Sequence, residues 1–83
     1  MYLARVYVTL KPTVNDPKGL AIQAGLRDLA YTSVTGVRLG KYLEVKLAEK
    51  NEADARKKVD GMCKDLLANM IIEDYRFDLE AVK

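Results

Sequence analysis

Apolar and polar positions alternate over the first ten residues. One face of this segment carries Ala4, Val6, Val8 and Leu10, and the other carries Leu3, Arg5, Tyr7 and Thr9. A period of two is typical of a β-strand with one buried face. Pro12 cannot donate a hydrogen bond to a neighbouring strand, so we expect the strand to end before it.

Asp16 and Pro17 indicate the start of a helix. A residue before proline avoids helical angles, its carboxylate can accept free N–H groups of the first turn, and Pro17 suits the first helical position. Apolar residues then recur at helical spacing, at Ile22, Leu26, Leu29 and Ala30. We expect an amphipathic helix that ends near Ala30. Gly19 and Gly25 weaken it but permit a close approach by another segment.

Alternation returns over residues 34–47. The apolar face of this segment carries Val37, Leu39, Leu43, Val45 and Leu47. Lys41 interrupts that face next to Gly40. This interruption predicts a bulge or tight bend in one long strand, or equally a hairpin that divides the segment into two strands.

A second helix is expected to begin after Asn51, a good N-cap residue, and to end near Asn69. Its apolar stripe consists of Ala55, Val59, Met62, Cys63, Leu66 and Leu67. Acid-before-base pairs at i, i+4 support it, namely Glu52–Arg56, Asp54–Lys58 and Asp60–Lys64. A last alternating strand is predicted over residues 72–79.

The element order β-α-β-α-β predicts a single domain over residues 1–83. We expect an α+β fold of ferredoxin-like type, with two layers and two helices on one face of an antiparallel sheet. The other sheet face would carry large side chains among charged ones, namely Leu3, Tyr7, Tyr42 and Ile72. A chain this short, with one cysteine, has little core, so we expect it to form oligomers through that sheet face. Scattered surface residues are the alternative explanation.

Charge and hydropathy exclude several classes of partner. The formal net charge is +2 and neither sign is clustered, which argues against nucleic acid. No apolar run approaches the roughly 20 residues of a membrane span, so no membrane partner is expected. The N-terminal residues lack the pattern of a signal peptide, and we therefore expect a cytoplasmic protein.

Few residues in the sequence are suited to catalysis. There is no histidine, which removes the commonest general base and metal ligand. Cys63 lies on an apolar helix stripe and is expected to be buried. Glu73 and Asp74 are adjacent in a strand and point to opposite faces, so they cannot act as a pair. We predict no catalytic residue and no metal ligand.

The segment Arg38-Leu39-Gly40-Lys41-Tyr42 is the most suggestive of a binding site. Two cations flank a glycine, which can bring backbone close to a phosphate or to another chain. Such a segment is more often surface charge than an anion site.

Four segments, in this order and spacing, give the chain a resemblance to the PurS family over nearly its whole length. They are Val6-Tyr7-Val8-Thr9-Leu10-Lys11, Asp16-Pro17-Lys18-Gly19, Val37-Arg38-Leu39-Gly40-Lys41-Tyr42, and Cys63-Lys64-Asp65-Leu66-Leu67-Ala68-Asn69 with Ile72-Glu73-Asp74-Tyr75. The chain departs from the family at Met70, where members typically carry a proline.

The resemblance implies a non-catalytic subunit of phosphoribosylformylglycinamidine (FGAM) synthase, a glutamine- and ATP-dependent ligase of purine biosynthesis. The implied partners are a synthetase subunit, PurL, a glutaminase subunit, PurQ, and further copies of the chain in a homodimer or homotetramer. ATP and Mg would belong to the assembled complex, with no cofactor in this subunit. We expect Arg38, Gly40, Lys41 and Tyr42 to bind a partner, because arginine and tyrosine are typical interface anchors.

Two other functions stay open from the sequence. A ferredoxin-like regulatory domain would bind a small ligand such as an amino acid between subunits. Such domains usually have a glycine in the turn between the first strand and first helix, whereas residues 11–15 contain none. A stand-alone enzyme is disfavoured by the scarcity of catalytic residues.

Overall fold

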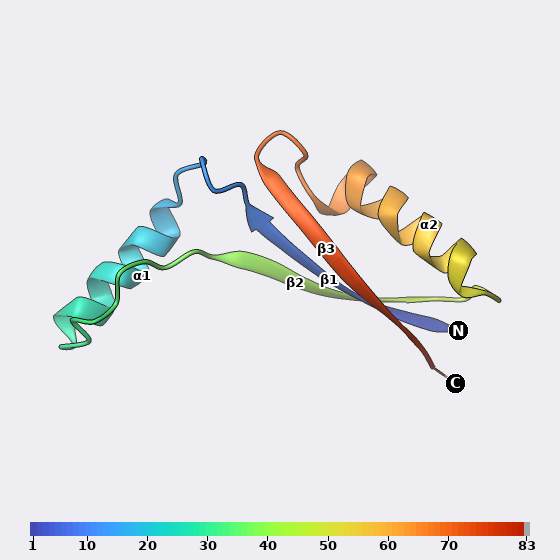
Figure 1. Cartoon of the computed structure of the whole chain (residues 1–83), viewed down its shortest axis with the longest axis horizontal. Coiled ribbons are helices and arrows are strands. Elements are labelled where there is room, and N and C mark those ends of the chain that lie inside the picture. The colour runs from blue at the N-terminus through green and yellow to red at the C-terminus, as the bar shows by residue number, and fades with distance from the viewer. Residues whose placement is uncertain (83) are drawn as a thin grey trace.

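Three strands alternate with two helices in the predicted order (Figure 1). The structure is a computed structural model and describes residues 1–82. Its elements are strand β1 (Tyr2–Leu10), helix α1 (Pro17–Asp28), strand β2 (Gly40–Leu47), helix α2 (Glu52–Met62), the π-helical turn η1 (Cys63–Leu67) and strand β3 (Glu73–Ala81).

The strands form one antiparallel sheet in the order β2-β1-β3. Val6 lies opposite Leu43 on one side and opposite Phe77 on the other. Because side chains alternate along a strand, these three residues share one face of the sheet, which we call the helix face. Tyr7 lies opposite Tyr42 and Arg76 and belongs to the other face, which we call the open face.

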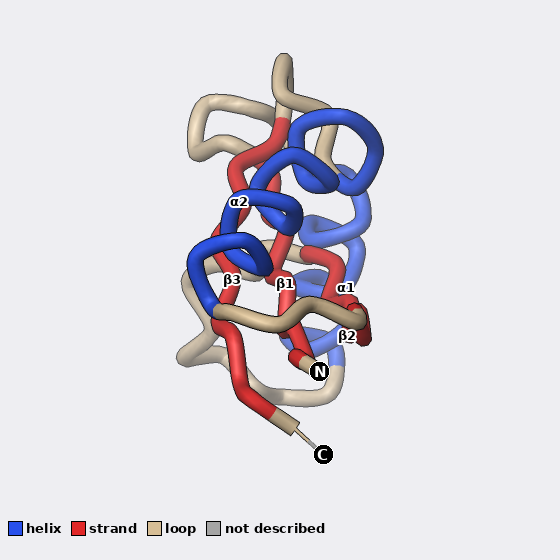
Figure 2. The backbone as a smooth tube through the Cα atoms, turned by 90° about the vertical axis from the view of Figure 1, so that its right-hand side faces the viewer, coloured by secondary structure: helices blue, strands red, loops and turns tan. Residues whose placement is uncertain are grey.

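The core lies between the helix face and α2, which contacts β3 and β1 (Figure 2). Its buried apolar residues are Ala4, Val6, Val8, Ala55, Val59, Cys63 and Ala68. The Arg56 guanidinium lies over the Phe77 ring, 5.7 Å from its centroid, and adds a contact between α2 and β3. The apolar stripe predicted for the second helix is therefore confirmed at Ala55, Val59 and Cys63.

The second helix ends in a wider turn than predicted. Ala68 N donates to Cys63 O at 2.9 Å, an i→i−5 bond, so the last turn is π-helical. Asn69 follows in a turn, where its side chain accepts from Ile71 N. Two of the predicted helix ion pairs form, but Lys58 pairs with Glu49 rather than with Asp54.

Helix α1 does not lie on the sheet of its own chain. It extends beyond the end of the sheet, and residues 30–39 return alongside it (Figure 1). We call residues 17–39 the arm. Arg27 Nη2 donates to Val34 O at 2.9 Å and holds the two limbs of the arm together. Ala30 turns the chain at the tip with a positive φ of 75°.

The arm makes the molecule elongated, with extents of 50 × 28 × 14 Å. Its radius of gyration is 16.4 Å, whereas a compact domain of this length has about 12 Å.

The structure corrects three details of the sequence analysis. Only α2 covers the helix face, although two helices were expected there. Residues 34–39 are not a strand, because they run beside α1 with no strand to pair with, and β2 begins at Gly40. Ile72 lies in the turn before β3, so only Leu3, Tyr7 and Tyr42 of the predicted set share the open face.

Candidate partner-binding surfaces

The four residues predicted to bind a partner lie at two different places. Arg38 ends the arm, and its Nη2 donates to Lys11 O at 2.9 Å. Gly40 and Lys41 begin β2 at the same end of the sheet, whereas Tyr42 points to the open face. The structure thus brings Arg38, Gly40 and Lys41 together and separates Tyr42 from them.

Gly40 is required by the close approach of β1. A Cβ atom at this position would lie 2.6 Å from Val8 O, well inside van der Waals contact. The glycine therefore serves the junction between the arm and the sheet, rather than leaving backbone free for a ligand.

Lys41 ties the start of β2 to the end of the second helix. Its Nζ donates to Leu67 O at 3.2 Å and lies 3.7 Å from a Glu73 carboxylate oxygen. Lys11 similarly pairs with Asp74 at 3.0 Å. These exposed pairs balance one another, so this end of the sheet does not form a cationic cluster.

A cavity of about 250 Å³ opens at this end, between the base of the arm and the sheet. Its lining includes Asp16, Lys18, Lys41 and Glu73. Because two carboxylates and two ammonium groups line it, the cavity favours neither an anionic nor a cationic ligand.

Asp16 forms the main contact at the base of the arm, and its second role was missed by the sequence analysis. Its side chain is only 4% exposed. Oδ1 accepts from Gly19 N at 2.9 Å, as predicted for an N-cap, and Oδ2 accepts from Leu39 N at 2.7 Å. The N–H groups of Leu39 and then Gly19 lower the pKa of Asp16. The Asp16-Pro17 pattern predicts the helix cap. No local pattern predicts the second hydrogen bond, because its donor, Leu39 N, lies 23 residues further along the chain.

Gly19 completes this contact. A Cβ atom there would collide with Val37 O, so only glycine lets the two limbs approach so closely. We call the group of Asp16, Gly19 and Leu39 the lock.

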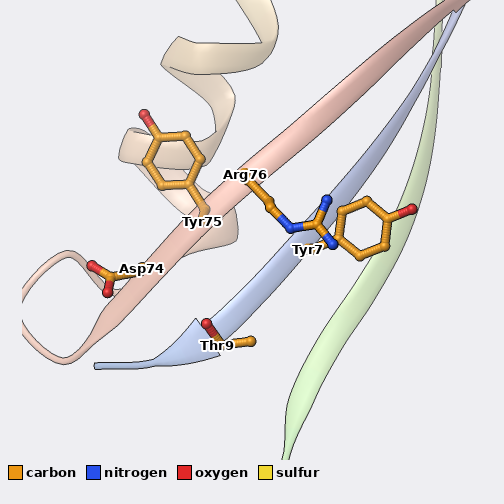
Figure 3. Close-up of a pocket in the computed structure, with 5 residues that line it drawn as sticks. All are labelled: Tyr7, Thr9, Asp74, Tyr75 and Arg76. Atoms are coloured by element: carbon orange, nitrogen blue, oxygen red, sulfur yellow. The ribbon is translucent and has the colours of Figure 1, made fainter. Parts of the chain in front are cut away.

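The open face carries a contiguous row of side chains across the three strands, in which the two tyrosine rings are tilted by 41° to one another. The Arg76 guanidinium lies 4.0 Å from the centroid of the Tyr7 ring, and the Tyr7 and Tyr42 rings are 5.2 Å apart. Tyr42 OH donates to Glu44 at 2.9 Å, and this bond raises the pKa of Tyr42. Arg76 reaches across β1 to Tyr7 beside a cavity of about 120 Å³ (Figure 3). These contacts hold the side chains of the row in place against one another, so the open face presents ordered aromatic and charged groups.

Two reactive side chains of the helix layer, Cys63 and Asp60, are held by burial and by a hydrogen bond to the sheet. Burial raises the pKa of the Cys63 thiol, which makes it a poor nucleophile at neutral pH. Tyr75 OH donates to Asp60, and this bond raises the pKa of Tyr75 to about 12. Within residues 1–82, no group of three or more acidic or cysteine side chains could hold a metal ion.

The comparisons with known proteins agree with this architecture. Residues 3–81 match the profile of the PurS family, described as phosphoribosylformylglycinamidine (FGAM) synthase. The chain belongs to the PurS family.

The relatives cover the chain almost completely. The PurS subunit of FGAM synthase from Synechocystis is 49% identical over 82 residues, which is 99% of this chain and 82% of that protein. PurS of Bacillus subtilis has a solved structure that superposes with a TM-score of 0.89 at 44% identity, covering 98% of this chain and all of that one. A chain in the structure of PurLQS from Thermotoga maritima superposes at 0.85 with 27% identity, covering 96% and 99%.

Membership of the PurS family confirms the resemblance and the α+β fold inferred from the sequence. No helix of residues 1–82 is long and apolar enough to cross a membrane. The roles of Arg38, Gly40, Lys41 and Tyr42 in binding a partner stay predictions.

Proposed function

We propose that this chain is the non-catalytic adaptor subunit of FGAM synthase, which holds the synthetase and glutaminase subunits together for ammonia transfer. The observation that carries the proposal is its likeness, over nearly its full length, to a chain of the Thermotoga PurLQS structure. The side chains of this subunit support the assignment, because its thiol is buried and the carboxylates of Asp60, Asp74 and Glu80 are paired with cationic neighbours.

Ammonia transfer gives the adaptor a physical purpose. Free ammonia is lost to solvent, so the two larger subunits must be docked closely enough to keep the path closed. A small subunit with organised surfaces at its open face and at the arm can contact two partners at once. ATP and Mg would then bind in the assembled complex, and the complex would work in the cytoplasm.

Two parts of the surface fit partner binding. Arg38 and Lys41 lie at the base of the arm, where a partner could contact both. Tyr42 stands 51% exposed on the open face, next to Tyr7. A second copy of the chain is a further proposed partner, as a homodimer or homotetramer.

The assembly can be tested by mixing PurL and PurQ with and without this chain and measuring the mass of the species formed. We expect a ternary complex only in the presence of the chain. A PurL–PurQ complex of equal affinity in its absence would contradict the adaptor role.

A further inference from the structure

The cavity at the base of the arm combines charges of both signs in one small space. Lys18 in the first turn of α1 and Lys41 at the start of β2 supply two ammonium groups. Asp16 and Glu73 supply two carboxylates. The lining therefore carries four charged groups and no net charge. Such a lining is complementary to a neutral molecule that itself carries one positive and one negative group.

Glu73 has one carboxylate oxygen available to a ligand. Its Oε1 accepts from Asn69 N at 2.7 Å and lies 3.7 Å from Lys41 Nζ. Oε2 accepts no hydrogen bond from residues 1–82, and it is accessible, because no buried side-chain oxygen of the described chain lacks a partner. The side chain is only 15% exposed, so a charged contact made there is weakened less by water than one on the open surface. Asp16, by contrast, uses both oxygens in the lock.

Lys18 supplies the available cation of the cavity. The ammonium group of Lys41 already donates to Leu67 O and lies beside Glu73. Lys18 is exposed, and its ammonium group forms no ion pair within residues 1–82. The cavity thus offers one acceptor for a positive group, at Glu73, and one donor for a negative group, at Lys18.

The size of the cavity and its apolar residues restrict the ligand further. Leu10 and Leu39 line it together with the charged groups. Its volume of about 250 Å³ corresponds to roughly eight water molecules of about 30 Å³ each. A small molecule with a short uncharged side chain fits this space, whereas a nucleotide or a folded segment of another protein exceeds it.

We propose that this cavity binds a free α-amino acid with an uncharged side chain, whose ammonium group binds Glu73 Oε2 and whose carboxylate binds Lys18 Nζ. Leu10 and Leu39 contact the side chain of the ligand. The ligand brings one charge of each sign, so the filled cavity stays neutral. The site lies within one chain, whereas the regulatory domain considered from the sequence would bind its ligand between subunits.

The first experiment tests which groups of the ligand are recognised. The full chain is titrated with L-alanine, L-leucine and L-glutamine, and with the N-acetyl and methyl ester derivatives of each, while isotope-edited NMR follows the backbone amides of Lys18, Leu39 and Glu73. N-acetylation removes the ammonium group, and the ester removes the carboxylate. We expect saturable shifts at these amides with at least one amino acid, and binding of its two derivatives that is about tenfold weaker or more. Shifts that saturate with none of the three amino acids, or equal binding of an amino acid and its derivatives, would overturn the proposal.

The second experiment assigns the two contacts. Lys18→Gln removes the cation, and Glu73→Gln removes the negative charge while its amide oxygen can still accept from Asn69 N. The matched controls are Lys57→Gln and Glu52→Gln, at exposed positions of α2 outside the cavity. We expect each cavity variant to bind the amino acid about tenfold more weakly and both controls to bind it as wild type does. Binding at wild-type strength by either cavity variant would overturn the assignment.

A comparison of variants with derivatives separates recognition from a general change in the fold. The methyl ester has no carboxylate for Lys18 to bind, so Lys18→Gln should bind it at least as tightly as wild type does. The N-acetyl derivative has no ammonium group for Glu73, and the same holds for Glu73→Gln. A loss of equal size for the amino acid and for both derivatives would contradict the two assigned contacts.

The outcome is separable from that of the adaptor proposal, because these titrations use the chain alone. A chain that binds no amino acid but still brings PurL and PurQ together would refute this site and leave the adaptor role intact. A chain that binds an amino acid in the cavity but binds neither subunit would do the reverse.

Discussion

Asp16 and Leu39 are joined across 23 residues by a 2.7 Å hydrogen bond from the Leu39 amide to Asp16 Oδ2. The same carboxylate caps α1 through Gly19 N. One side chain thus starts a helix and fixes where the returning chain enters β2. The direction of the whole arm depends on this carboxylate.

The pH dependence of the arm follows from the pKa of Asp16, which Leu39 N–H and then Gly19 N–H hold below its ordinary value of 3.8. A group whose folded-state pKa is lowered stabilises the fold fully above its ordinary pKa, and this contribution is lost as pH falls through the lowered value. We expect the contribution of Asp16 to the free energy of unfolding to be full above pH 3.8 and to be lost as the pH falls through the lowered value.

This pH prediction is checked by chemical denaturation of wild type and Asp16→Asn across the acid range, which gives the free energy of unfolding of each against pH. Other carboxylates titrate there in both proteins, so the difference between the two curves isolates Asp16. The difference should shrink as the pH falls. A difference between wild type and Asp16→Asn that stays constant across the acid range would contradict the prediction.

The hydrogen bond from Tyr75 to Asp60 predicts a late step in an alkaline titration. Because Asp60 raises the pKa of Tyr75 to about 12, its contribution to stability is present below the ordinary value of 10.0 and is lost as pH rises through about 12. Absorbance of tyrosinate should show one of the five tyrosines ionising last, and Tyr75→Phe should remove that step. A titration with the late step still present in Tyr75→Phe would refute this assignment.

Val59 is fully buried between α2 and the sheet, so truncation there tests the core. Val59→Ala removes two buried methyl-sized groups and leaves a cavity, and we expect a loss of about 2 kcal/mol in the free energy of unfolding. Chemical denaturation measures this loss. Ala53→Gly, on the exposed side of the first turn of the same helix, is a control that should cost less than about 1 kcal/mol through helix propensity alone. A smaller loss for Val59→Ala than for Ala53→Gly would contradict the described core.

Arg38 and Lys41 are the residues at the base of the arm that we expect a partner subunit to contact. Replacing both by alanine should weaken assembly with PurL and PurQ by about tenfold, while the isolated chain keeps its fold. The control is the pair Lys50→Ala and Lys57→Ala, which removes the same charge from exposed positions elsewhere. Equal assembly by the two double variants would show that the base of the arm contacts neither partner.

Local patterns in the sequence predicted most of the elements. Strand β1 shows strict alternation, and Asp16-Pro17 and Asn51 are strong helix starts, so these elements were placed within a residue or two. The alternation of Val37 and Leu39 was misleading, because this part of the arm runs beside α1 with no strand to pair with, and Leu39 is 41% exposed. A period of two describes which side of the backbone is covered, and it does not specify what covers it.

The arm could not be predicted from local patterns. Helix α1 has an apolar stripe, which indicates that it packs on something, but the pattern is the same for a sheet of its own chain and for another copy. Leu39 N is one of many backbone amides, so its bond to Asp16 leaves no mark in the sequence. The segment from Arg38 to Tyr42 was predicted as one binding site because its residues are consecutive in the sequence. Side chains alternate along a strand, however, so Tyr42 lies on the open face, away from Arg38 and Lys41.

The central claim, that the chain joins a glutaminase to a synthetase, is tested most directly by comparing glutamine-dependent with ammonia-dependent FGAM synthesis by PurL and PurQ, with and without the chain. We expect ammonia-dependent synthesis in both mixtures and glutamine-dependent synthesis only when the chain is added. Glutamine-dependent synthesis that is equally fast without the chain would contradict the account, and titration with amino acids would then test the ligand-binding alternative.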